Sequence, residues 1–197
     1  MSYIAVSRRT ARRRESEQAT RRLVVILSIS AAAAWLASVL MAATTHVVGV
    51  VHTYALIAHI LAMVVSFGAI LLVDWHGFLW LIGRRGLAET LRLDGAATPL
   101  IWGGLAGLLA SGVFLDARLS SPLTDVKLLA VLVLTLNGIM LIPLMRRLAH
   151  LPPSASFLDL TLGQRFHMLS CLAISQLCWW TAIVIGFINA ASQPLTS

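Results

Sequence analysis

Apolar residues along the chain fall into five long blocks, which short polar or charged stretches separate. Each block holds about 20 residues or more, the length that a helix needs to cross roughly 30 Å of hydrocarbon. The blocks lack the alternation of barrel strands, and a helix satisfies its own backbone groups in lipid. We therefore predict an all-α integral membrane protein, a bundle of five transmembrane helices. The predicted spans are 23–43, 48–74, 97–115, 125–145 and 166–190.

The composition supports a membrane rather than a soluble protein. The 197 residues are 58% hydrophobic and 12% charged, with a mean hydropathy of +0.86. A soluble domain usually carries about a quarter charged residues, which is more polar surface than this chain can supply. We predict a single transmembrane domain at 23–190, a basic tail at 1–22 and a short tail at 191–197, with the lipid bilayer as the surrounding partner.

The basic residues are distributed unequally between the two ends of the predicted bundle. Of the 15 basic residues, 13 lie on the side of the N-terminus, and Arg118 and Lys127 lie on the other. The positive-inside rule then places the N-terminus in the cytoplasm and, after five spans, the C-terminus outside. The seven arginines before Leu23 adjoin an apolar span, so we interpret them as a topology signal that also touches anionic lipid, and not as a nucleic-acid site.

Two further segments have more than one interpretation. The stretch from Phe78 to Leu93 mixes Leu, Trp and Arg, which is typical of a short amphipathic surface helix but equally of a loop. In the third span, Gly103, Gly107 and Ser111 recur every four residues, with further glycines beside them. Small residues at this spacing let two helices approach closely, either within one chain or in a homodimer. We predict that this stripe faces a neighbouring helix and not lipid.

Ionisable side chains inside a bilayer are costly, so they are the first candidates for a functional site. His52 and His59 lie seven residues apart, on one helical face but about 10.5 Å apart in rise, too far to share one metal ion. His59 is further from either end of its predicted span than any other histidine, which makes it the strongest candidate. The alternative for each histidine is a side chain near the interface with no function.

Other polar residues have simpler roles. Asp74 marks the inner edge of its predicted span, and Asn137 and Gln176 are expected to hydrogen-bond across helices. Cys171 and Cys178 are too far apart along one helix for a disulfide. The sequence contains no phosphate loop and no GxSxG, HExxH or CxxC motif. Catalytic residues are therefore not identified, no metal-ion site is predicted, and whether the chain is an enzyme stays undecided.

The stretch ALIAHILAMVVSFGAILL resembles the first helix of the HemJ-type and CopD-type bacterial membrane proteins, in which a histidine precedes a Phe/Trp-Gly pair. Here these residues are His59 and Phe67-Gly68. The later GLLASGVFL and TDVKLLAVLVL are similar to the next two helices, with Gly112 and Lys127-Leu128 in the matching places. The resemblance covers residues 50–145 and implies a multi-pass protein of the bacterial cytoplasmic (inner) membrane.

The HemJ type implies haem b bound through the histidine and oxidation of a porphyrinogen, and the CopD type implies copper handling. This chain lacks the HemJ arginine after the glycine pair, and its loop DARLSSPLTD has neither Met nor His. The expectation that remains is a haem-binding, redox-associated bundle centred on His59, with His52 on the same face and Lys127 as a propionate or ligand partner.

A second function class stays open beside this one. The chain can also be a non-catalytic membrane subunit, an assembly or scaffold protein whose helices pack against other membrane subunits or against a second copy.

Overall fold

The computed structural model describes residues 2–115 and 121–191, with the side chains of residues 14–115, 121–189 and 191. Within these ranges the chain is helical and has no strand. The elements are α1 (Ser2–Thr44), α2 (Val50–Leu81), α3 (Leu87–Gly112), α4 (Pro122–Leu148), the short 3-10 helix η1 (Phe157–Asp159) and α5 (Leu162–Ala191). All five α-helices are long and apolar enough to cross a membrane, which confirms the predicted fold class.

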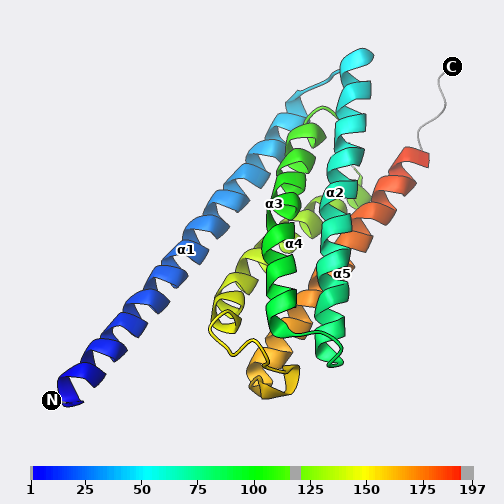
Figure 1. The fold of residues 1–197 in the computed structure, drawn as a ribbon. Helices are drawn as coiled ribbons and strands as arrows, with labels where there is room; N and C mark the ends of the chain where they lie inside the picture. The colour runs from blue at the N-terminus through cyan, green and yellow to red at the C-terminus, as the bar shows by residue number, and fades with distance from the viewer. Residues whose placement is uncertain (1, 116–120, 192–197) are drawn as a thin grey trace.

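Two pairs of consecutive antiparallel helices form most of the bundle. The most extensive contacts join α2 to α3 and α4 to α5, while α1 packs mainly on α4 and touches α3. Figure 1 shows that α1 runs obliquely beside the other helices and that its N-terminal end diverges from them. The α2–α3 turn and the η1 segment lie at the same end of the bundle as this N-terminus (Figure 1). We call this the basic end, because it holds Arg21, Arg22, Arg84, Arg85, Arg92, Arg146, Arg147 and Arg165.

The closest helix contact in the bundle involves α2 and α3. A Cβ atom added at Gly104 would lie 2.5 Å from Cβ of Ser66 and 2.8 Å from the backbone oxygen of Ala62. Ser66 is fully buried, and its Oγ donates a hydrogen bond to the Ile101 carbonyl at 2.9 Å. The backbones can approach this closely only because residue 104 has no side chain.

The small residues of α3 that face α2 differ by one position from the predicted stripe. Gly107 and Ser111 face α2: a Cβ at Gly107 would lie 3.0 Å from that of Ala62, and Ser111 is buried. Gly103 is exposed and a Cβ there would meet nothing within 4 Å. Gly104 therefore takes the place in this contact that the sequence pattern gave to Gly103.

The basic end is closed by a hydrophobic cluster that changes the predicted helix boundaries. Trp80 and Leu87 are 2% and 1% exposed, and they pack with Leu144, Leu148 and Phe157. The indole Nε1 of Trp80 donates to the Ala155 carbonyl at 2.9 Å. Because burial of these residues extends both helices, α2 continues to Leu81 and α3 begins at Leu87. The predicted surface helix or loop at 78–93 is wrong: only a tight turn separates the two helices.

Helix α1 is held to the bundle by hydrogen bonds at both ends of its apolar part. Trp35 Nε1 donates to the Leu128 carbonyl at 3.0 Å, and Ser38 Oγ donates to the Leu109 carbonyl at 2.8 Å. At the basic end, the Arg146 guanidinium donates to Thr20 Oγ1 at 2.9 Å. The predicted tail at 1–22 is continuous with the first span as one helix from Ser2. The predicted tail at 191–197 lies, from residue 192 on, outside the described residues.

The Gly104 contact predicts different effects for the same substitution at neighbouring glycines. Gly104→Ala should lower the stability of the protein in detergent by about 1–3 kcal/mol, because the new methyl group overlaps Ser66 and Ala62. Gly103→Ala adds the same methyl group where there is space, and should leave stability unchanged or slightly raise it. Thermal unfolding of both variants tests this, and equal melting temperatures would contradict the close contact.

The η1 segment predicts a dependence on pH outside the membrane spans. The backbone N–H of Ser156 donates to Asp159 Oδ2 at 2.7 Å. Hydrogen bonds from the backbone and side chain of Ser156 lower the pKa of Asp159 below its ordinary 3.8. Because the folded-state pKa is lowered, the stabilisation that these hydrogen bonds give to the folded state is present above pH 3.8. It is lost as the pH falls through the lowered pKa. Amide exchange at Ser156, corrected for intrinsic rate, should therefore rise in strongly acidic solution, and Asp159→Asn should remove the dependence.

Candidate functional site

The imidazole of His59 is joined to α3 by a hydrogen bond across the α2–α3 contact. Its Nδ1 lies 2.9 Å from Oγ of Ser111. The same Oγ lies 2.5 Å from the Gly107 carbonyl one turn earlier. His59 is half-buried and Ser111 is buried, so the pair is largely shielded by protein.

The contacts of Ser111 indicate which ring nitrogen of His59 carries the proton. A serine hydroxyl has one hydrogen to donate, and the Gly107 carbonyl at 2.5 Å is nearer to Oγ than the Leu108 carbonyl at 3.4 Å. If the hydroxyl donates to Gly107, it accepts from His59, which favours the neutral tautomer with the proton on Nδ1. In that tautomer Nε2 has a lone pair that can bind a metal centre or accept a proton. The Leu108 carbonyl also hydrogen-bonds the ring.

Two other residues complete the surroundings of His59. The ammonium group of Lys127, near the start of α4, is close enough to interact electrostatically with the imidazole. A Cβ atom at Gly112 would lie 3.8 Å from Cε1 of His59, so the end of α3 passes beside the ring. The site thus joins α2, α3 and α4 at the end of the bundle opposite the basic end.

His59 lies nearer to this end than its predicted span implied. Because α2 runs from Val50 to Leu81, His59 is nine residues, or about 14 Å, from the first residue of the helix. Its partner Ser111 is one residue from the end of α3. His52 lies two helical turns further out on α2 and is half-buried. Lys127 is therefore within electrostatic range of His59, whereas His52 is two turns away along α2.

His76 and His150 each contact a carbonyl four residues earlier in the chain. His76 Nδ1 contacts the Leu72 carbonyl at 3.1 Å, and His150 Nδ1 contacts the Arg146 carbonyl at 2.6 Å. Among residues 2–115 and 121–191, no group of three or more His, Cys, Asp or Glu side chains is placed to hold a metal ion.

Side-chain hydrogen bonds also join α2 to α5, through a pair of residues that the sequence analysis did not connect. The amide Nε2 of Gln176 donates to Asp74 Oδ2 at 2.5 Å, and Nε1 of Trp180 donates to Gln176 Oε1 at 3.1 Å. Asp74 is half-buried, and α2 continues for two turns beyond it. The helix therefore extends past Asp74, at which the sequence predicts the inner edge of the span. Gln176 does hydrogen-bond across helices as predicted, and Asn137 does so to the Cys171 carbonyl at 2.8 Å.

Comparison with known proteins adds no relative to this description. No family model matches the chain, and no curated protein or solved structure matches it.

The His59–Ser111 contact predicts a single imidazole tautomer. In protein labelled with ¹⁵N-histidine, His59 should show a protonated Nδ1 and an unprotonated Nε2 at neutral pH. Ser111→Ala should weaken this preference, because one of the two acceptors is lost and the Leu108 carbonyl remains, at a cost of about 0.5–1.5 kcal/mol. A proton on Nε2 in the wild type would mean that the ring donates instead to the Leu108 carbonyl, which also hydrogen-bonds it.

Proposed function

We propose that the chain is a multi-pass protein of the bacterial cytoplasmic membrane that binds haem b through His59 and has a redox-associated role. Its N-terminus would lie in the cytoplasm and its C-terminus outside, following the excess of basic residues at the basic end. The observation that carries the proposal is the contact between Nδ1 of His59 and Oγ of Ser111, which favours the tautomer in which Nε2 has a lone pair for a ligand.

This arrangement fits the chemistry of a haem ligand. An imidazole that binds iron through one nitrogen commonly donates its other N–H to a protein group, which fixes the ring and increases its basicity. Lys127 would supply a positive charge for a haem propionate near the same helix ends. Bound haem would provide one-electron redox chemistry, and the chain's own residues would set the ligand and the polarity around it.

The positions that carry the family resemblance support the same site. His59, Gly112 and Lys127 come from three different helices; Gly112 lies beside the ring of His59, and Lys127 is within electrostatic range of it. No second histidine lies at this level among the described residues, since His52 is two turns away on the same helix. Within one chain, the iron would therefore have His59 as its only histidine ligand.

The second candidate function is a membrane subunit that packs against other chains or against a second copy. The observation that favours it is the exposed face of α3, where Gly103, Ala106 and Ala110 present small side chains outward. Such a face would let another helix approach closely.

Absorption spectra of protein purified from haem-replete cells test the haem proposal. The wild type should show a Soret band, and His59→Ala should lose at least about nine-tenths of the bound haem. His52→Ala is the matched control on the same helical face and should keep the band. Ser111→Ala should weaken haem affinity by roughly 10–100-fold, as expected for a residue that orients an iron ligand.

Two results would contradict the proposal. A wild-type protein without a Soret band would leave the subunit function as the better explanation. A band that survives in His59→Ala would place the haem elsewhere in the chain.

A further inference from the structure

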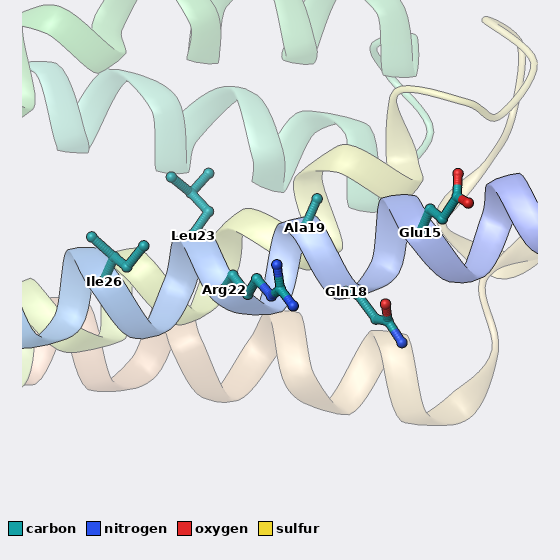
Figure 2. A pocket seen from close by; sticks show the side chains of 6 residues that line it. All are labelled: Glu15, Gln18, Ala19, Arg22, Leu23 and Ile26. Carbon is teal, nitrogen blue, oxygen red and sulfur yellow. The ribbon is translucent and has the colours of Figure 1, made fainter.

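A surface hollow lies on α1, away from the interior of the bundle. The side chains that line it, from Glu15 to Ile26, all belong to this one helix (Figure 2). Because its lining comes from a single helix, the hollow is a gap between exposed side chains and not an enclosed site. A polar contact that the proposed function leaves unused lies instead inside the bundle, where Asp74 on α2 meets Gln176 on α5.

The amide of Gln176 is held in one orientation by Trp180. An indole Nε1 can only donate, so the amide atom that it contacts at 3.1 Å is the oxygen, Oε1. The amide nitrogen, Nε2, then faces Asp74 and donates to Oδ2 of the carboxyl group at 2.5 Å. One carboxyl oxygen of Asp74 is thus an acceptor in this contact, and Oδ1 is the oxygen that can carry a proton.

The helices on both sides place the carboxyl group of Asp74 within the membrane-spanning part of the bundle. Gln176 lies at the midpoint of α5, which runs from Leu162 to Ala191. On α2, Asp74 lies seven residues, or about 10.5 Å, before the last helical residue, Leu81, and the arginines of the α2–α3 turn lie beyond that point. A carboxylate at this depth costs free energy unless it has a counter-ion or a proton.

Aromatic rings form the rest of the contact between α2 and α5. Phe67 lies seven residues before Asp74, on the same face of α2. Its ring packs against those of Trp179 and Trp180 at centroid distances of 5.5 and 5.3 Å. Apart from Asp74, the side chains that these contacts bring together between the two helices are therefore neutral.

Asp74 has no cationic partner in this contact. Among the residues whose side chains the structure describes, its carboxyl group forms no ion pair. The nearest titratable residue on α2 is His76, which lies about 200° round the helix and contacts the Leu72 carbonyl through Nδ1. On α3, the ionisable residue at this level of the antiparallel pair is Asp94, an acid that cannot supply a positive charge.

The other two helices of the interior add no charge at this level. α4 has no charged residue between Lys127 and Arg146, and α5 has none between Arg165 and its end at Ala191. The titratable residues in this length of α5 are His167, Cys171 and Cys178. His167 lies nine residues, or about 13.5 Å of helix, before Gln176, and a thiol supplies no positive charge. These surroundings leave a proton as the means of neutralising Asp74.

We propose that Asp74 is an intramembrane proton-binding site, with Gln176 as the residue that orients its carboxyl group. A proton from water binds Oδ1 of the carboxylate and is released again as the pH rises, with no change in oxidation state. Oδ2 is then the carbonyl oxygen of the neutral acid and keeps the hydrogen bond from Gln176. The site does not depend on the proposed haem, because His59 lies 15 residues, or about 22 Å, away along α2.

Infrared spectroscopy of the full-length protein in lipid nanodiscs tests the proposal, because a protonated carboxyl group has a C=O stretching band that a carboxylate lacks. At neutral pH the wild type should show this band, labelling with ¹³C-aspartate should move it, and alkaline buffer should remove it reversibly. Asp74→Asn should lose the band. Because asparagine is neutral, has nearly the same shape and can still accept from Gln176, this variant should keep the wild-type melting temperature. The matched control, Asp125→Asn, removes an exposed aspartate in the first turn of α4 and should keep the band.

A second variant tests the orienting role of Gln176. Gln176→Leu removes the N–H donor, so the band of Asp74 should remain but move to a higher wavenumber, because its carbonyl oxygen loses a hydrogen bond. If Gln176 only joined α2 to α5, the substitution would lower the melting temperature without moving the band. A band at an unchanged wavenumber would therefore contradict the orienting role.

Four results would overturn the proton-binding site. A wild type without the aspartic acid band at neutral pH would show that Asp74 is ionised. A band that survives in Asp74→Asn would assign the proton to another aspartate, such as Asp94. A band that alkaline buffer does not remove would indicate a permanently neutral structural group. Loss of the band on addition of sodium chloride at constant pH would show that Asp74 binds a metal cation in preference to a proton.

Discussion

The close approach of α2 and α3 at Gly104 sets the positions of the groups that matter most in this bundle. The contact with Ser66 and Ala62 leaves no room for even a methyl group, so the two helices cannot slide past each other without a clash. Seven residues further along each helix, this fixed register places His59 opposite Ser111. Lipid provides no hydrophobic force between helices, which makes such tight packing one of the main sources of stability here.

The helices are also joined by side-chain donors that reach backbone carbonyls of their neighbours. Trp35, Ser38, Ser66 and Asn137 each donate to a carbonyl on another helix. A helical carbonyl has a second lone pair, so it can accept this bond and keep its own helical bond. Each such bond contributes on average about 0.6 kcal/mol in a membrane. Since the acceptor is backbone, these bonds specify where two helices touch without requiring a matched polar residue on the partner.

Much of the fold could be predicted from hydropathy alone, because five apolar blocks of sufficient length allow little else in a bilayer. The helix boundaries at the basic end could not be predicted. Trp80 and Leu87 stand among charged residues in the sequence, and only the fold shows that the η1 segment buries them. The choice between Gly103 and Gly104 depends on the rotation of α3 against α2, which neighbouring glycines in a sequence do not reveal. The sequence similarly indicates His59 and Lys127 as candidates. It does not reveal the contact of Ser111 with the His59 ring or the pairing of Asp74 with Gln176, because both depend on the register between helices.

The packing of α1 on α4 has a consequence for how the protein is made. The indole of Trp35 bonds to the carbonyl of residue 128, which is 93 residues later in the chain. At about 5–20 residues per second, the ribosome needs roughly 5–20 s to reach that residue. During this interval the main neighbour of α1 has not been synthesised, and the indole N–H of Trp35 lacks its acceptor. Helix α1 is therefore synthesised well before α4, and its contact with α4 can form only after this interval, a delay that does not arise when the complete chain folds.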